Sequence, residues 1–125
     1  MVYGIGTDIV RIERLRAALE RHGEGFAMRI LAEEERAGFA ASRDSARYLA
    51  KRFAAKEAFG KALGTGVAAP ATLHAIAVGH DALGKPVFRF GNQLAAYMSE
   101  RHLNAHLSLS DEADYVVAFA LIETT

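Results

Sequence analysis

Apolar side chains recur along the N-terminal half of the chain in two patterns, one typical of strands and one typical of helices. Residues 2–10 are rich in β-branched and apolar side chains, which predicts a buried strand. An apolar stripe at helical spacing predicts a helix over residues 11–22. A further helix is expected over residues 32–41, with acidic residues in its first turn, where they suit the helix dipole. Asp44 then stands at the N-cap position of a long helix expected over residues 45–63.

The remaining segments complete the expected fold. Residues 26–31 predict a short helical turn, and residues 73–78 and 86–90 predict two strands joined by a turn. A helix is expected over residues 93–101, and residues 106–123 follow the pattern of a strand, a polar turn and a second strand. Because the connections between strands are short, the order predicts an α+β fold rather than a doubly wound parallel sheet.

Composition narrows the classes of protein that fit. A chain of 125 residues, 51% of them hydrophobic, predicts one domain with a real core. Fifteen basic residues balance fifteen acidic ones, which argues against a general nucleic-acid binder. The chain has no cysteine, so it has no disulfide framework and no thiolate metal site. We see no apolar run of about 20 residues and no signal-peptide pattern, so we expect a cytoplasmic protein without a membrane span.

The long helix contains the first candidate catalytic and metal-binding side chains. Glu57 and Lys61 are four residues apart and share a helical face, with Phe53 one turn before them. The helix ends in a Gly-Thr-Gly turn over residues 64–66. A carboxylate can hold a hard cation, and a lysine one turn away can meet the phosphate that the cation bridges. The alternative is a solvated ion pair worth ~0.2–0.5 kcal/mol.

Two other segments place polar groups where apolar ones are expected. Asp8 interrupts the first strand, where a carboxylate is costly unless it is paired or bound to metal. Alternatively, Asp8 marks the end of that strand or caps the helix that follows. Near the C-terminus His106, Ser108 and Ser110 alternate with leucines, so the three share one face of a strand. A lone histidine is usually structural, but this row is a candidate phosphate or hydroxyl site.

Arginines gather on one flank of the helix expected over residues 11–22. Arg14 and Arg21 lie a heptad apart, and Arg11 lies one turn before Arg14. The flank is either a solvated face whose arginine stems cover apolar surface, or a docking strip for an acidic protein.

Together these segments resemble the holo-acyl-carrier-protein synthase family, the small 4′-phosphopantetheinyl transferases. The matching motifs are GIGTDI with Asp8, RFAAKEAFGKALGTG with Glu57 and Lys61, GKP at residues 84–86, and HLSLS followed by YVVAFALIE. They run from the first residues to the last strand, in order and at the expected spacing. One departure is Asp111, where many relatives carry a second histidine, so no role for that histidine is carried over.

The resemblance implies a 4′-phosphopantetheinyl transferase fold and transfer of the phosphopantetheine arm of coenzyme A to a serine of an acyl carrier protein, in support of fatty acid biosynthesis. The leaving group would be adenosine 3′,5′-bisphosphate. Asp8 and Glu57 would hold Mg²⁺, and Lys61 would complete the catalytic set beside the phosphates. The implied contacts with coenzyme A are Arg52, Phe53, Lys61, Gly64, Thr65, Gly66, Lys85, Pro86, His106 and Ser108.

The resemblance also implies a homotrimer with active sites between neighbouring subunits, and an acidic carrier protein docked on Arg11, Arg14 and Arg21. The general base stays open between Glu57, a water bound to the metal and a water exchanged from bulk. The use of Mn²⁺ in place of Mg²⁺ and the identity of the carrier protein stay open too.

Two rival functions fit the residues alone. One is a non-catalytic adapter that binds an acidic partner through the arginine flank and tolerates loss of the carboxylates. The other is a metal-dependent nucleotide phosphohydrolase, which would act on coenzyme A without a carrier protein.

Overall fold

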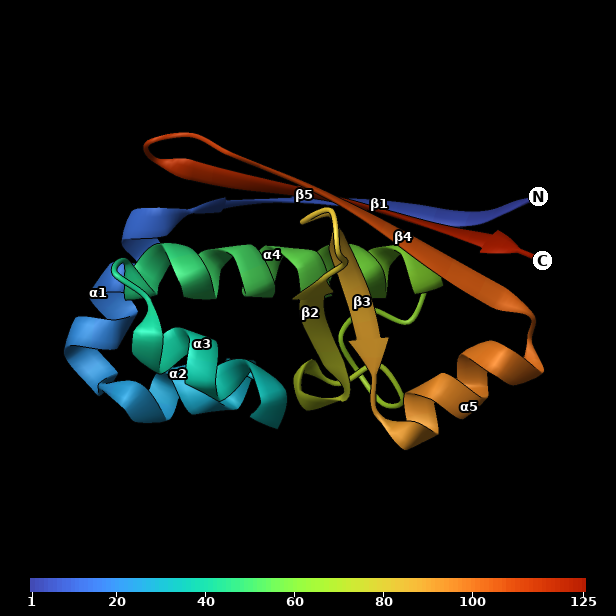
Figure 1. The fold of residues 1–125 in the computed structure, drawn as a ribbon, viewed down its shortest axis with the longest axis horizontal. Helices are drawn as coiled ribbons and strands as arrows, with labels where there is room; N and C mark the ends of the chain where they lie inside the picture. The colour runs from blue at the N-terminus through green and yellow to red at the C-terminus, as the bar shows by residue number, and fades with distance from the viewer.

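A three-stranded antiparallel sheet lies across a long helix in the computed structural model, which describes residues 1–125. The strands are β1 (Val2–Arg11), β5 (Tyr115–Thr124) and β4 (Leu103–Asp111), in that order across the sheet. The helix is α4 (Ser45–Leu63), which covers one face of the sheet (Figure 1). We call the opposite face, turned away from α4, the outer face. This arrangement confirms the predicted α+β fold with a long central helix.

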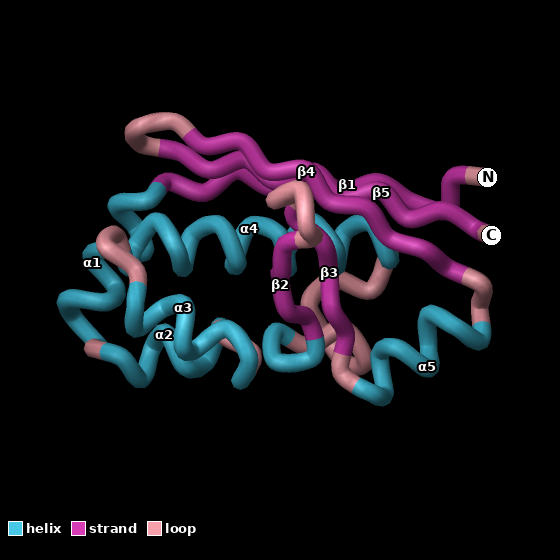
Figure 2. Tube along the Cα trace, in the orientation of Figure 1, coloured by secondary structure: helices cyan, strands magenta, loops and turns pink.

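Most of the other elements lie on the side of α4 away from the sheet (Figure 2). At one end lie α1 (Ile12–His22), α2 (Glu24–Ile30), the 3-10 turn η1 (Glu33–Glu35) and α3 (Arg36–Ala41). Further along the helix lie the 3-10 turn η2 (Leu73–Ala75), the hairpin of β2 (Ile76–His80) and β3 (Pro86–Phe90), and α5 (Asn92–Glu100). Strand β3 packs beside β4, so this second hairpin lies beyond the β4 edge of the main sheet. No helix of the structure has the length and apolar character needed to cross a bilayer.

Small residues let β1 lie directly on the backbone of α4. A Cβ atom added at Gly4 would collide with the carbonyl oxygen of Ala62, and one added at Gly6 would collide with that of Ala58. Glycine is therefore required at both positions for this close approach. As a consequence, Asp8, on the same face of β1, is brought against the last turns of α4.

Both ends of α4 are closed as the sequence predicts. The carboxylate of Asp44 accepts a hydrogen bond from the backbone N–H of Arg47 at 3.1 Å, which confirms the predicted N-cap. At the other end Gly64 adopts φ 90°, and its N–H donates to the carbonyl oxygen of Gly60 at 3.0 Å. A left-handed glycine is the usual C-terminal stop of a helix.

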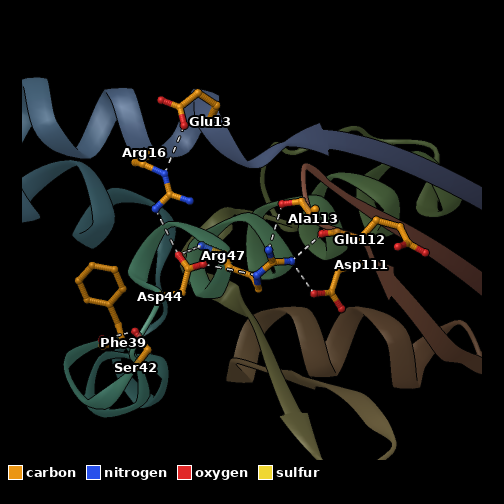
Figure 3. Close-up of polar contacts among 9 residues, drawn as sticks. All are labelled: Glu13, Arg16, Phe39, Ser42, Asp44, Arg47, Asp111, Glu112 and Ala113. Atoms are coloured by element: carbon orange, nitrogen blue, oxygen red, sulfur yellow. Dashed lines mark hydrogen bonds and ion pairs between the residues drawn. The ribbon is translucent and has the colours of Figure 1, made fainter.

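The turn between β4 and β5 is fastened to the first turns of α4 by Arg47 (Figure 3). Its Nη1 donates to Oδ2 of Asp111 at 2.8 Å and to the carbonyl oxygen of Glu112 at 2.7 Å. Its Nη2 donates to the carbonyl oxygen of Ala113 at 3.1 Å. Asp111 is therefore a structural partner of α4 in this chain.

Four local expectations are corrected by the structure. The first strand is buried on one face only, and Ile5 and Ile9 on its outer face are 59% and 61% exposed, because no element of the chain covers that face. Asp8 neither ends the strand nor caps α1, since β1 continues to Arg11 and the N-cap of α1 has no side-chain hydrogen bond.

The helix expected over residues 32–41 is divided into η1 and α3, and Glu35 is buried rather than turned to a helix dipole. In the strand expected over residues 73–78, residues Leu73–Ala75 form the 3-10 turn η2, where the Thr72 hydroxyl accepts from the N–H of Ala75 at 3.2 Å.

Candidate active site

Asp8 and Lys61 meet where β1 crosses the end of α4. The ammonium of Lys61 donates to the carbonyl oxygen of Thr7 at 2.9 Å and lies 3.3 Å from Oδ1 of Asp8. Asp8 is 17% exposed and Lys61 is 53% exposed, so the pair opens to solvent on the lysine side. An ammonium has three N–H donors, and the contacts with Thr7 and Asp8 leave one free for a phosphate oxygen.

Glu57 lies one turn before Lys61, and the charges of both Asp8 and Lys61 act on its carboxyl group. Partial burial raises the pKa of the Glu57 carboxyl, the negative charge of Asp8 raises it further, and the positive charge of Lys61 opposes the rise. The fold therefore holds Glu57 beside a second carboxylate whose charge disfavours the ionisation of Glu57. This is the arrangement that a bound cation would stabilise.

The donor set is one that Mg²⁺ accepts. The structure contains no group of three or more His, Cys, Asp or Glu side chains that could hold a metal ion. Mg²⁺ is commonly held by one or two carboxylates, with water and substrate phosphates in its remaining positions. Asp8 and Glu57 offer two carboxylates of this hard oxygen type, so the residues present fit that ion.

The turn after α4 folds back onto the helix next to this cluster. Both Gly64 and Gly66 donate their N–H to the carbonyl oxygen of Gly60 at 3.0 Å. A Cβ at Gly60 would lie 2.7 Å from the backbone of Gly66, so only glycine permits the fold-back. The exposed residues Gly64, Thr65 and Gly66 follow Lys61 directly. Phe53, one turn before Glu57, is half-buried and packs against the core.

Four of the other predicted contacts with coenzyme A lie on different surfaces of the chain. His106 and Ser108 stand on the outer face of β4, opposite the face that packs on α4. Nε2 of His106 and Oε1 of Glu123 lie 2.8 Å apart. Lys85 and Pro86 belong to the β2–β3 hairpin, beyond the β4 edge, whereas Asp8 lies on β1 at the other edge. One chain therefore does not bring these four residues to the carboxylate pair.

Arg52 lies on yet another side of α4. Its guanidinium stacks on the ring of Tyr48, 3.5 Å from the ring centroid, and its side chain is 10% exposed. Its Nε is 3.8 Å from Oε2 of Glu35 and forms no hydrogen bond. This placement turns the charge of Arg52 toward the interior and away from Glu57.

Arg11, at the N-cap of α1, and the arginines within α1 differ in their contacts. Arg11 donates from Nη2 to the hydroxyl of Tyr115 at 2.8 Å. Arg14 and Arg21 are exposed and form no hydrogen bond or ion pair within the chain. These two are therefore free to meet a partner's carboxylates.

Sequence reasoning missed a buried ion pair behind the site. Lys56 is completely buried, and its Nζ lies 2.6 Å from Oε1 of Glu35. The sequence contains a sign that Lys56 is buried, because Lys56 and Glu57 are adjacent and so point about 100° apart on a helix. If Glu57 faces β1, Lys56 faces the core, and a buried lysine needs an acidic partner. The sequence does not show that Glu35 is that partner.

Comparison with known proteins agrees with the motifs. Residues 4–120 match the family model of the 4′-phosphopantetheinyl transferase superfamily. The chain is 73% identical over 124 residues to a holo-[acyl-carrier-protein] synthase of Azoarcus sp. (strain BH72), covering 99% of both chains. It is 57% identical over 123 residues to one from Dechloromonas aromatica, covering 98% of both.

Solved structures show the same fold. The crystal structure of holo-[acyl-carrier-protein] synthase from Neisseria meningitidis is 47% identical, with a TM-score of 0.95 over 99% of this chain and 100% of that one. A synthase from Bacillus anthracis in complex with CoA (3′,5′-ADP) is 32% identical, with a TM-score of 0.84 over 100% and 99% of the two chains. The resemblance found in the motifs is thus confirmed along nearly the whole length, and the chain belongs to the holo-acyl-carrier-protein synthase family of the 4′-phosphopantetheinyl transferase superfamily.

Proposed function

We propose that this chain transfers the 4′-phosphopantetheine arm of coenzyme A to a serine hydroxyl of an apo-acyl carrier protein, releasing adenosine 3′,5′-bisphosphate. The observation that carries the proposal is the meeting of Asp8, Glu57 and Lys61 at the junction of β1 and α4. Relatives that are 73% and 57% identical over almost the full chain are holo-[acyl-carrier-protein] synthases, which supports the same reaction here. Such a reaction serves fatty acid biosynthesis, and we expect it in the cytoplasm.

The residues of the cluster have separate tasks. Asp8 and Glu57 would hold Mg²⁺, which when bound neutralises charge that develops on the pyrophosphate as the phosphoryl bond breaks. Lys61 is tethered to the Thr7 carbonyl and directs its remaining N–H toward solvent, where it would meet a phosphate oxygen. Preorganised charges of this kind lower the barrier because they need not reorient during the reaction.

The outer face of the sheet favours association between copies of the chain. Ile5 and Ile9 of β1, together with Tyr115, Val117 and Phe119 of β5, expose apolar surface on that one face. Exposed apolar patches of this kind commonly mark contact surfaces. We propose that they pack together in a closed homotrimer, as the family resemblance implies.

A closed trimer would also account for the positions of the remaining predicted substrate contacts. His106, Ser108, Lys85 and Pro86 are on or beyond β4, while the carboxylates are at the β1 edge. In a closed ring the β4 side of one subunit can face the β1 edge of the next, so each coenzyme A would be held by two chains.

The carrier protein would dock on α1. Acyl carrier proteins are acidic, and Arg14 and Arg21 present uncompensated charge on the exposed flank of that helix. Arg11 is held by Tyr115 and would mark the edge of the same surface.

Mass spectrometry of an apo-carrier protein incubated with coenzyme A and Mg²⁺ tests the proposal. Transfer predicts a gain of about 340 Da, the mass of the phosphopantetheine arm, on one serine. Hydrolysis of coenzyme A without a mass gain would support the phosphohydrolase instead. Binding of the carrier protein with neither change would support the adapter.

A further inference from the structure

A buried cluster of charges fixes α4 from the side opposite the site. Nζ of Lys56 lies 2.6 Å from Oε1 of Glu35, and it donates to the carbonyl oxygens of Ile30 at 2.7 Å and Leu73 at 3.0 Å. All three donors of the ammonium are therefore satisfied inside the protein. These bonds tie α4 to the end of α2 and to η2.

Glu35 connects the same helix to two further segments. Its Oε1 accepts from the N–H of Ala32 at 2.9 Å, and its Oε2 accepts from the N–H of Val78 in β2 at 2.8 Å. Arg52 adds a second positive charge, 3.8 Å from Oε2. Glu35 is therefore the hub through which α4 is joined to η1 and to the hairpin that carries Lys85 and Pro86.

Burial of these charges is not an efficient source of stability. Removing an ammonium and a carboxylate from water is costly, and apolar side chains of similar volume often replace such pairs without loss of stability. Burial lowers the pKa of Lys56, while the charge of Glu35 opposes that effect. Directional bonds, by contrast, can select one arrangement of packed elements among several.

The opposite face of α4 needs such a constraint. It meets β1 where the backbone at Ala58 and Ala62 lies directly against Gly6 and Gly4, a close contact that holds only while these positions face each other. A small rotation or shift of α4 would bring the carbonyl oxygens of these alanines against strand positions that carry side chains. The bonds to Lys56 come from several directions and oppose both motions.

We propose that Glu35 and Lys56 are positioning residues for the transfer reaction: they set the rotation and axial position of α4, so that Glu57, the next residue, and Lys61 face Asp8. This inference rests on the proposed function. It assigns to the pair a role in the geometry of the site rather than in the stability of the fold.

The test removes the Glu35–Lys56 pair, keeps its volume and leaves Arg52 in place. The double variant Glu35→Leu with Lys56→Met is compared with the wild-type chain for urea unfolding, for kcat at saturating substrates and for the Mg²⁺ concentration that gives half-maximal rate. We expect the double variant to stay folded, with a lower unfolding midpoint because the N–H groups of Ala32 and Val78 lose their acceptor. Under conditions where it is folded, kcat should fall at least tenfold and the Mg²⁺ requirement should rise. The KM for carrier protein should stay within about twofold, because α1 is not bonded to the cluster.

Lys51→Met is the matched control. Lys51 lies on α4, five residues before Lys56, and its only ion-pair partner is Asp111 at 3.7 Å. The Lys51→Met variant removes a lysine from the same helix and leaves the contacts of Glu35 intact. Its kcat should therefore match that of the wild-type chain.

Each outcome decides the question. A stable double variant with wild-type kcat would overturn the proposal, and so would a double variant that fails to fold, since the pair would then be a stability element. The single variant Lys56→Met, in which Glu35 keeps its two backbone donors, must show the same loss of kcat while folded. If the wild-type chain itself transfers nothing to the carrier protein, the proposed function fails instead.

Discussion

The ammonium of Lys61 lies 3.3 Å from Oδ1 of Asp8, although 53 residues separate the two in the chain. Lys61 thereby supplies positive charge beside the carboxylate pair before any cation is bound. A cation held by Asp8 would share that carboxylate with Lys61 and free part of the ammonium for phosphate. With a cation bound, the site would be organised around two positive charges, one from Lys61 and one from the cation.

Replacement of either carboxylate should abolish most of the transfer. We expect Asp8→Ala and Glu57→Ala each to reduce kcat/KM by about 10²–10³, the usual cost of losing one electrostatic stabiliser of a transition state. The rate of mass gain on the carrier protein is measured across a Mg²⁺ titration, and circular dichroism checks the fold. Near-wild-type rates in both variants at all Mg²⁺ concentrations would show that the metal assignment is wrong.

The raised pKa of Glu57 predicts a pH dependence of stability in the metal-free chain. Because the fold favours its neutral form, the stability that this group contributes is present below its ordinary pKa of 4.5 and is lost as pH rises through the raised value. Glu57→Gln should therefore gain stability relative to the wild-type chain across that interval. Lys61→Met should move the interval to higher pH, because the lysine lowers the pKa of Glu57. Urea unfolding at a series of pH values measures both effects, and equal slopes for all three chains would contradict them.

Charge reversal on α1 should affect the carrier protein and not coenzyme A. We expect Arg14→Glu combined with Arg21→Glu to raise the KM for carrier protein about tenfold at low ionic strength, and less at high ionic strength, because exposed charges act mainly on association. Arg101→Glu, at the far end of the molecule near the end of α5, is the control for a charge reversal elsewhere (Figure 1). A parallel rise in the KM for coenzyme A would place the docking surface elsewhere.

The outer face of the sheet should determine the oligomeric state. Placing a charge there, as in Phe119→Glu or Val117→Lys, should reduce the mass measured by light scattering to that of one chain, 13.5 kDa, and remove activity with it. Ala95→Glu, on the exposed side of α5, is the control, and its mass by light scattering should equal that of the wild-type oligomer.

Mixing an inactive Glu57 variant with an inactive His106 variant should restore activity if each site is formed by two chains. A fully active monomer would refute the trimer.

Asp111 should prove structural rather than catalytic. Asp111→Ala leaves Arg47 bonded to two carbonyl oxygens of the turn, so we expect it to lower the free energy of unfolding by only about 0.5–1 kcal/mol. Arg47→Ala removes all of these bonds and should cost more stability than Asp111→Ala. Neither change should alter kcat at a temperature where the variants are folded. Thermal unfolding and the transfer assay give the two numbers, and a fall in kcat for Asp111→Ala alone would assign it a part in the reaction.

The sequence by itself determined the class of fold, the family and the candidate carboxylates. These conclusions follow from local patterns, which depend only on residues close in the sequence. Examples are the alternation of the strands, the helical spacing, the Asp44 cap and the glycine that ends α4. The motifs around Asp8 and Glu57 also identified which side chains carry chemistry, since few residue types suit a hard cation beside a phosphate.

Tertiary structure decided which of those residues meet. Gly4 and Gly6 bring Asp8 onto α4 because they remove the side chains that would hold the strand away, and no local pattern records that contact. The alternation of β4 put His106 and Ser108 on the face opposite Asp8. Glu35 became the partner of Lys56 only because η1 folds under α4, and a buried charge is paired by whichever segment the fold delivers.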